Sequence, residues 1–275
     1  MAFSVITNVA SLSAQRNLAR TQESLTKNMS RLSSGLRINS AADDAAGLGI
    51  SEKLRAQTRG LAQAERNAMD GVSLLQTAEG SLNEVSGILV RMRELALSSA
   101  TDTNNDTQRG YLNEEFTALG EELTRLTKVT DFNGTKLLDG TASGLEIQVG
   151  LNADATNDRI KITIPGMDAA TLGVDGDISS KTNAQDVLSV IDTAIDTVSD
   201  SRAGLGALQN RMQITISNLT SSRENLTAAN SRIRDVDVAE ETAAMTRNSI
   251  LMQAGVSVLS QANQAPQVAL SLLGR

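Results

Sequence analysis

Apolar residues recur at seven-residue spacing through most of the second half of the chain. Between residues 190 and 233 no seventh position is missed, and no proline interrupts the run. Sustained heptad spacing is typical of a coiled-coil seam rather than of a globular surface helix. The pattern therefore predicts one long helix over 190–233. Its seam consists of Ile191, Val198, Leu205, Met212, Leu219, Leu226 and Ile233.

The first half of the chain carries a matching stripe, followed by a shorter one. Apolar positions between 72 and 96 step by threes, fours and sevens, which predicts a helix that pairs with 190–233. A further amphipathic helix is predicted from about 106 to 129. The two stripes are Val72, Leu75, Leu82, Val85, Leu89, Met92 and Ala96, and then Leu112, Phe116, Leu119, Leu123 and Leu126.

Between these helices the apolar period changes to two. An Asn-Gly turn signal in DFNGTKLLDG (131–140) precedes two alternating runs, which predict half-buried strands. We interpret 131–182 as a small β-hairpin-rich insertion. The predicted fold is mainly α, a long antiparallel coiled-coil helical rod formed by the N- and C-terminal segments, with this insertion between them. The alternating residues are Leu145, Ile147, Val149 and Leu151, and then Ile160, Ile162 and Ile164.

The two outermost segments are amphipathic but only weakly apolar. Ordering the backbone costs about 1–2 kcal/mol of conformational entropy per residue. Burial of these narrow apolar stripes within one chain does not offset that cost. Five basic residues and one acidic residue give +4 over 1–42, and two basic and four acidic residues give −2 over 235–275, so pairing is favoured. We expect 1–42 plus 235–275 to form a terminal coiled-coil domain that is fully buried only against neighbouring subunits, and 43–234 to form a helical rod domain. The terminal stripes are Leu18, Leu25, Met29, Leu32 and Leu36, and Val238, Met245, Met252 and Leu259.

Composition removes most familiar chemistries. With no histidine and no cysteine, the common zinc ligands, imidazole catalysis, thiol nucleophiles and disulfides are all excluded. A net charge of −7 argues against nucleic acid or an anionic membrane as a partner. No apolar run is long enough for membrane insertion, and MAFSVITNVASLSAQR does not resemble a secretory signal peptide. We expect no cofactor and no metal.

The stretch RINSAADDAAGLGIS (37–51) combines paired acids with a glycine-x-glycine. Ser40 and Asp43 have capping-box spacing, so Asp43 and Asp44 are predicted in the first turn of a helix. Gly47 and Gly49 then lie inside it, which indicates close approach of another backbone. A phosphate loop needs a third glycine or a Gly-Lys-Ser/Thr ending, and neither is present.

Three other stretches have a structural explanation. Ser24 and Lys27 match the Ser-x-x-Lys of some acyl-transfer enzymes, but the companion motifs are missing and a solvated helix face is favoured. The acids around Gly176 are interpreted as a turn. The acids of SRIRDVDVAEE lack calcium-loop spacing and indicate a helix junction with an acidic first turn. These residues are Asp175 and Asp177, and then Asp235, Asp237, Glu240 and Glu241.

The longest motifs resemble those of the bacterial flagellins, over nearly everything outside 140–185. The N-terminal signature stands here as LSSGLRINSAADDAAGLGISEKLRAQTRGL (32–61), and TDFNGTKLLDG matches the family's hairpin. The C-terminal signature is LGALQNRMQITISNLTSSRENLTAANSRIRDVDVAEET (205–242). Departures from the family's pattern are Ala42, Gly49 and Gly274.

The resemblance implies a non-catalytic structural subunit that polymerises into the extracellular flagellar filament for motility. It implies that the terminal helices form an inner tube and the rod an outer ring, with outer domains absent or minimal. It also implies export, unfolded, through the flagellar export apparatus. Implied partners are copies of the same chain, that apparatus, a C-terminal flagellin chaperone, and the filament cap and hook–filament junction proteins.

Particular residues follow from the same resemblance. Arg91, Leu95 and Glu115 match a patch that contacts neighbouring subunits and that a vertebrate Toll-like receptor reads on many flagellins. The residues expected at subunit packing are Leu18, Leu25, Leu32, Leu36, Asp43, Asp44, Gly47, Gly49, Met245, Met252 and Leu259.

Two other classes of protein stay open from the residues alone. A coiled-coil adaptor or another secretion-system protein would form a discrete oligomer whose size does not grow with concentration. A hydrolase using Ser24, Lys27 or the acids would lose its activity on Ser24→Ala.

Overall fold

The computed structural model describes the backbone of residues 7–273 and the side chains of residues 7–264. The chain divides into two units, Met1–Ala56 with Asn225–Arg275 and Gln57–Glu224, here called the terminal unit and the central unit. Gly274, one of the departures from the flagellin pattern, lies outside the described residues. The helices are α1 (Val9–Ser34), α2 (Ala45–Ser99), α3 (Asp106–Val129), α4 (Ala169–Leu172), α5 (Lys181–Arg234) and α6 (Val238–Leu273).

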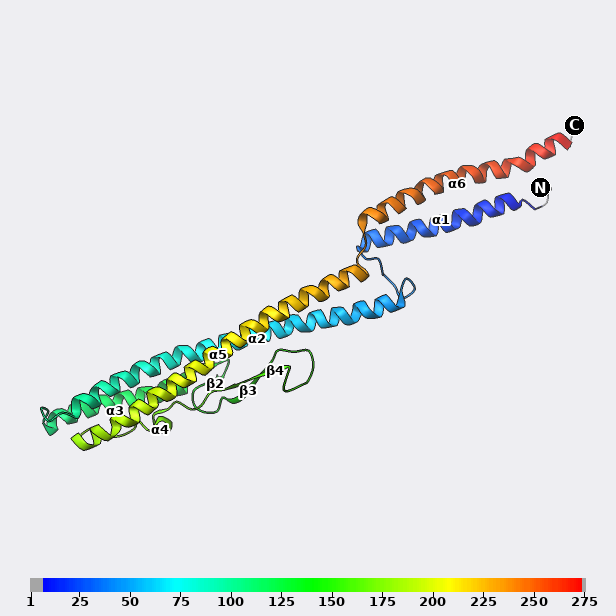
Figure 1. Cartoon of the computed structure of the whole chain (residues 1–275). Coiled ribbons are helices and arrows are strands. Elements are labelled where there is room, and N and C mark those ends of the chain that lie inside the picture. Colours follow the sequence, from blue (N-terminus) through cyan, green and yellow to red (C-terminus); the bar gives the residue numbers. More distant parts are fainter. Residues whose placement is uncertain (1–6, 274–275) are drawn as a thin grey trace. The chain divides into compact units, whose positions relative to one another are not determined.

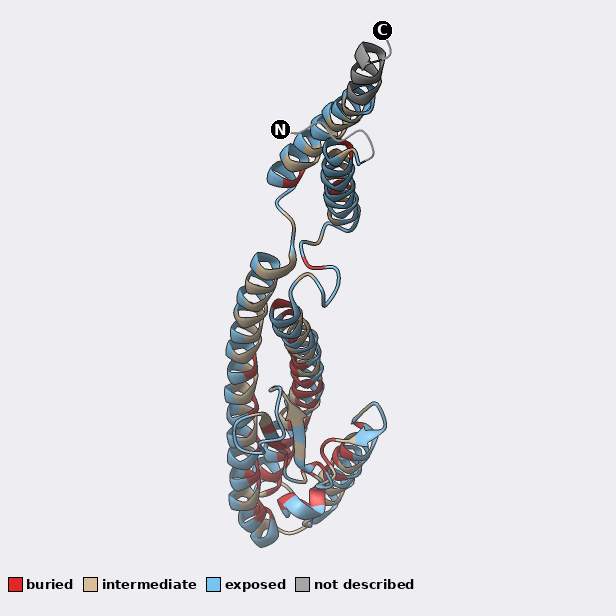
Figure 2. Cartoon of the chain, turned by 90° about the vertical axis from the view of Figure 1, so that its right-hand side faces the viewer, coloured by how far each residue is buried: buried red, intermediate tan, exposed pale blue. Residues whose placement is uncertain are grey.

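The core of the protein lies in the central unit, between α2, α3 and α5 (Figure 2). The predicted stripe of α2 is buried from Leu75 to Ala96, and Phe116 and Leu123 of α3 pack against it. The heptad seam of α5 is buried from Ile191 to Met212. Both the helices and the faces predicted for this core are therefore confirmed, and so is the mainly α fold class.

The seam of α5 continues beyond its buried part. Leu219, Leu226 and Ile233 keep the heptad spacing, but each is only half-buried in the single chain. Periodicity reports which face of a helix is apolar, whereas burial also requires a partner at that height.

Polar contacts also join α2 to α5 in antiparallel alignment. They lie outside the apolar seam and are partly exposed, so each contributes little to stability, and their role is to fix which residues face each other. The contacts within the central unit are Arg93 to Asp192 at 2.6 Å, Glu79 to Gln209 at 2.9 Å and Glu65 to Arg223 at 3.1 Å.

The insertion contains two antiparallel hairpins, β1 (Asp131–Phe132) with β2 (Thr135–Lys136) and β3 (Ser143–Gln148) with β4 (Arg159–Thr163). At the Asn-Gly signal, Asn133 has φ 50° and Gly134 φ 81°, as a two-residue hairpin turn requires. The predicted alternating residues face each other directly, with Leu145 opposite Ile162 and Ile147 opposite Ile160.

The expected extent of the first long strand is wrong. β3 ends at Gln148, so Val149 and Leu151 follow it in the loop. Leu151 instead covers Gly60 of α2, where an added Cβ would lie 2.5 Å from the Leu151 Cδ2. Packing on the glycine, rather than strand pairing, explains this apolar residue.

In the terminal unit, α1 and α6 lie side by side (Figure 1). Their exposed surface is extensive, since the buried residues of α1 are only Ser11, Leu25 and Asn28. Leu36, expected to complete the helical stripe, lies beyond the end of α1 and forms an isolated antiparallel bridge with Asp235. The reason is Gly35, which takes the left-handed conformation (φ 70°) and ends the helix.

The burial pattern of α2 predicts unequal effects for two leucines of the same helix. Leu89 is 0 % exposed and Leu97 is 58 % exposed. We expect Leu89→Ala to lower the free energy of unfolding by about 2–5 kcal/mol and Leu97→Ala to change it by less than about 0.5 kcal/mol. Urea unfolding followed by circular dichroism measures both, and equal effects would contradict the placement of the core.

Candidate subunit-assembly surfaces

The contact between α1 and α6 is a thin apolar seam. Leu25 is buried in it, while Leu18, Leu32, Met245 and Met252 are half-buried. Leu259 is likewise half-buried. Other large apolar side chains on the two helices are exposed within the described part of the single chain. They are Val9, Leu12, Met29, Val238, Ile250, Leu251, Val256 and Val258.

A groove of about 390 Å³ opens between α1 and α6. Its walls are Leu18 and Ala19 on one helix and Met252 and Val256 on the other, with Gln15 and Gln22 on the rim. Gly255 lies next to it, where an added Cβ would be 3.2 Å from the Leu18 Cδ1. The groove is apolar and has the size of one or a few side chains.

Where α1 ends and α6 begins, their connecting segments pair through the backbone. The Val236 N–H donates to the Gly35 carbonyl at 3.1 Å, and the Arg37 N–H donates to the Arg234 carbonyl at 2.7 Å. The Arg37 guanidinium also donates to the Ile233 carbonyl at 2.6 Å, which caps the C-terminus of α5. These bonds hold the two connections together at one point.

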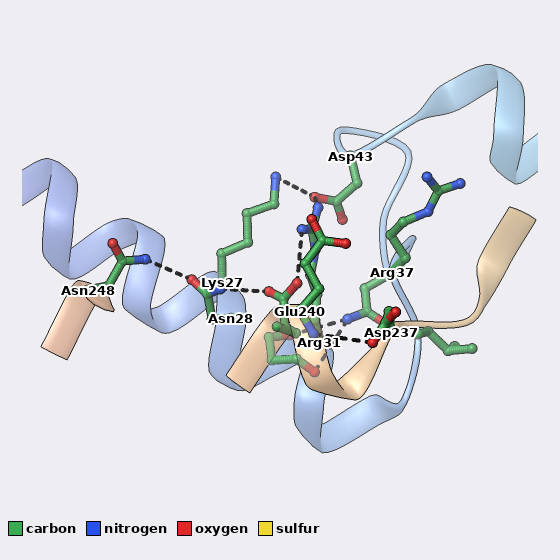
Figure 3. Close-up of polar contacts among 12 residues, drawn as sticks. Lys27, Asn28, Arg31, Arg37, Asp43, Asp237, Glu240 and Asn248 are labelled. Atoms are coloured by element: carbon green, nitrogen blue, oxygen red, sulfur yellow. Dashed lines mark hydrogen bonds and ion pairs between the residues drawn. The ribbon is translucent and has the colours of Figure 1, made fainter. Parts of the chain in front are cut away.

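A cluster of polar side chains, which we call the polar hub, lies between α1, the start of α6 and the connection after α1 (Figure 3). Asn28 and Glu241 are each only 8 % exposed, and the Asn28 Nδ2 donates to the Glu241 Oε1 at 2.8 Å. The remaining contacts extend from this pair to both sides. They are Asn248 Nδ2 to Asn28 Oδ1 at 3.1 Å, Arg31 to Glu241 at 3.8 Å, Arg31 to Asp43 at 4.0 Å and Lys27 to Asp43 at 2.7 Å.

Asp43 is the most strongly perturbed acid of the hub. Hydrogen bonds from the Lys27 ammonium and then from the Ser40 hydroxyl and N–H hold the pKa of Asp43 well below its usual range. Sequence reasoning placed Asp43 at a helix start and missed Lys27. Nothing in local spacing points to this contact, because it joins α1 to a turn after the end of the helix.

The predicted capping box at Ser40 is wrong. Residues 41–43 form a turn, α2 begins at Ala45, and the residue that caps it is Asp44. The Asp44 Oδ1 accepts from the Gly47 N–H at 2.8 Å. Asp43 and Asp44 therefore precede the helix instead of occupying its first turn, and only Asp44 faces its positive end.

The two glycines of this motif differ. An added Cβ at Gly47 would collide with the Asp44 carboxylate and lie 2.8 Å from the Ile38 Cδ1, whereas one at Gly49 would have no described atom within 4 Å apart from its own helical neighbours. The close approach expected at Gly47 is made by side chains rather than by a backbone. At Gly49 the single chain leaves open space.

The remaining candidate sites have structural roles. The Asp237 Oδ1 caps α6 by accepting from the Ala239 and Glu240 N–H groups at 2.9 and 3.2 Å. Asp177 accepts from the N–H of Ser179 at 2.8 Å, as a turn requires. Within the described part of the chain, no three acids come together as a metal site, and no helix has the length and apolar content needed to cross a membrane.

The structure separates the three residues matched to the receptor patch. Arg91 Nη2 lies 2.7 Å from Glu115 Oε1, and Arg91 also contacts Glu94 at 3.0 Å, so α2 and α3 present a charged surface here. Leu95 is only 3 % exposed and packs into the core. Its side chain supports this surface from below and is not part of it.

Comparison with known proteins agrees with these features. The family model for the bacterial flagellin N-terminal helical region matches residues 5–143, and that for the C-terminal helical region matches residues 188–273. A flagellin of Halalkalibacterium halodurans is 49 % identical over 97 % of this chain and 98 % of its own. The crystal structure of Bacillus cereus flagellin, 34 % identical, matches 60 % of this chain and 94 % of its own with a TM-score of 0.51.

A longer relative shows where this chain is short. Polar flagellin A of Vibrio parahaemolyticus is 36 % identical, and its alignment spans 376 positions while covering 100 % of both chains, against 275 residues here. Between the two family models, residues 144–187 are unmatched. This unmatched segment holds most of the β3–β4 hairpin and α4.

The fold and the family matches together define a helical, self-assembling structural protein rather than an enzyme. The chain belongs to the bacterial flagellin family, whose members are the extracellular subunits of the flagellar filament.

The two glycines at the start of α2 give a matched prediction. Gly47→Ala forces the Asp44 side chain off its capping position, and the loss of an N-cap costs about 0.5–2 kcal/mol. Gly49→Ala meets open space and gains about 1 kcal/mol of helix propensity. Hydrogen exchange of residues 45–50 should therefore accelerate in the first variant and slow in the second. Slower exchange in both variants would contradict the enclosure of Gly47.

The lowered pKa of Asp43 predicts a pH dependence. Because the folded pKa lies below the unfolded value of about 3.9, the stabilisation is complete above that value and is lost as the pH falls below it. We expect Asp43→Asn to weaken filaments at pH 7 but to make their loss as the pH falls below about 4 shallower than in the wild type. Sedimentation of filaments across this range measures the slope. Glu240→Gln serves as the exposed control, and a wild-type slope in Asp43→Asn would count against the contact.

Proposed function

We propose that this flagellin polymerises through its terminal unit, with the outward apolar faces of α1 and α6 covered by copies of the same chain. The observation that carries the proposal is that α1 and α6 bury few apolar side chains against each other and leave many exposed. In α1 the one large apolar side chain that is buried is Leu25, while residues such as Leu12, Leu251 and Val258 stay exposed. An apolar face of this extent on a secreted structural protein is favourable only when another molecule covers it.

The difference in burial between the two units also supports different positions for them in the filament. We assign 1–42 with 235–275 to an inner tube of the filament and 43–234 to an outer ring. Support comes from the helix breaks at 35–44 and 235–237, and from the core, which lies in the central unit. The groove between Leu18 and Met252 is one place where a neighbour's side chain would enter.

Particular residues are proposed at subunit contacts. Gly49 has open space around it within the chain, so a neighbouring helix would be able to approach closely there. Asp43, Asp44 and Gly47 act indirectly, by shaping the connection between α1 and α2. The Arg91–Glu115 surface is exposed and charged, which suits both a neighbouring subunit and, on released monomer, an innate immune receptor of the Toll-like class.

Export is proposed to occur in the unfolded state through the flagellar export apparatus. The absence of cysteine and the small buried core of the terminal unit support it, because neither a disulfide nor a stable terminal fold would resist threading. A chaperone that covers the C-terminal segment before export is expected on the same grounds, with the filament cap and hook–filament junction proteins as partners during assembly.

Replacing apolar residues of the proposed assembly face by aspartate tests whether this face is needed for polymerisation. Leu251→Asp with Leu259→Asp should abolish growth of seeded filaments while the circular dichroism of the central unit is kept, because both residues lie outside its core. Leu251→Met, which keeps the apolar surface, is the matched control. Electron microscopy of the same samples decides it, and normal filaments from the Asp variant would overturn the proposal. A discrete oligomer that never elongates would favour the adaptor function instead.

The export route has its own prediction. The wild-type chain should appear outside cells that carry a working flagellar export apparatus and be retained in cells that lack it. A variant stapled by two engineered cysteines in the central unit should be retained under oxidising conditions and released after reduction. Immunoblots of culture supernatants measure both, and equal secretion by the two strains would exclude this route.

A further inference from the structure

The apolar seam of the terminal unit does not by itself specify how α1 is aligned with α6. Leu18, Leu25 and Leu32 are spaced by seven residues, and so are Met245 and Met252. If α6 slides along α1 by one heptad, apolar residues meet apolar residues again. A second element must therefore decide between alignments that are nearly equal in buried apolar surface.

The polar hub is the element that differs between these alignments. Glu241 is buried, yet in the observed alignment it accepts a hydrogen bond from Asn28 at 2.8 Å and lies 3.8 Å from the Arg31 guanidinium. Asn28 is satisfied on its other side by Asn248 at 3.1 Å. Figure 3 shows the contact between the side chains of Asn28 and Asn248.

A slip removes these partners. One heptad in one direction brings Glu241 to the level of Gly35 and Ile38, which lie beyond the end of α1, and one heptad in the other direction brings it opposite Thr21 and Ser24. Neither set offers a cation or an amide. A buried carboxylate without its partners is strongly unfavourable, so each slipped alignment is penalised at this position.

The polar hub also connects α1 to the turn before α2. Lys27, next to Asn28, holds Asp43 in the turn before α2 at 2.7 Å. At the far end of the seam a second polar pair has the same alignment, since the Ser11 Oγ donates to the Asn263 Oδ1 at 2.7 Å. Two separated polar contacts thus agree on one register.

We propose that the polar hub is a register lock, which selects one alignment of α1 against α6 and is not required for the two helices to pair. The proposal depends on the proposed function in one respect, because its test uses filaments of the protein. A single buried polar residue that fixes register in a coiled coil is the best-attested use of such groups.

Cysteine pairs report the alignment, because the chain has no cysteine of its own. Ala19→Cys with Val256→Cys joins residues that line the same groove and reports the observed register. Ala19→Cys with Ser249→Cys reports a slip of one heptad in one direction, and Thr26→Cys with Val256→Cys reports a slip in the other. Intramolecular cross-links in oxidised filaments are separated from intermolecular ones by their monomer mobility in non-reducing gels.

The test variant replaces the hub's buried pair by apolar residues, Asn28→Leu with Glu241→Leu. With the native hub, the in-register pair should cross-link at least about ten-fold more than either slipped pair. In the test variant filaments should still form, and the slipped pairs should rise to within about three-fold of the in-register pair. Asn17→Leu with Glu240→Leu makes the same substitutions at exposed positions of the same helices and should leave the register unchanged.

Each other outcome is decisive. If the in-register pair stays dominant after the hub is removed, the alignment is set by the apolar seam, by the Ser11 pair or by the backbone bonds of Gly35 and Arg37, and the lock is wrong. If the test variant neither cross-links nor enters filaments grown from wild-type seeds, the hub is needed for pairing itself, which also overturns the proposal. Failure of the chain with the native hub to form filaments would instead refute the proposed function.

Discussion

The main physical constraint on this structure is the small apolar contact between α1 and α6. Leu25 is the one large apolar side chain buried in α1, and none is buried in the described part of α6. The central unit is the opposite case, with continuous buried stripes on α2 and α5 closed by α3. A stable fold is therefore concentrated in one unit, while the other keeps its apolar residues available for neighbouring subunits.

Because the apolar seam is thin, polar groups determine how α1 and α6 are aligned. At the connections between the helices, backbone bonds pair Gly35 with Val236 and Arg37 with Arg234. The polar hub adds buried side-chain contacts that only one alignment satisfies. Such contacts add little net stability, since burying charge and amide groups is costly, but they discriminate strongly against wrong arrangements. This combination suits the proposed role of the terminal unit, which is to become well defined when copies of the chain assemble.

Periodicity in the sequence was sufficient for the central unit. The heptads from Ile191 to Met212, the stripe from Leu75 to Ala96 and the Asn133-Gly134 turn each appear where they were predicted. They are local signals, because the period of apolar residues is imposed by the geometry of the helix or strand itself. The errors lie at element ends, where Ser40 resembles a cap, Leu36 continues a stripe and Leu151 continues an alternation without belonging to the element.

The sequence by itself determined the fold class, the faces that are apolar and the exclusion of histidine and cysteine chemistry, since these follow from spacing and residue type. Only the tertiary structure decided that Lys27 holds Asp43, that Asn28 meets Glu241 and that Leu95 lies beneath the Arg91–Glu115 surface. Those contacts join residues far apart in the chain. They depend on the alignment of one helix against another, which a repeating apolar pattern leaves degenerate by whole heptads.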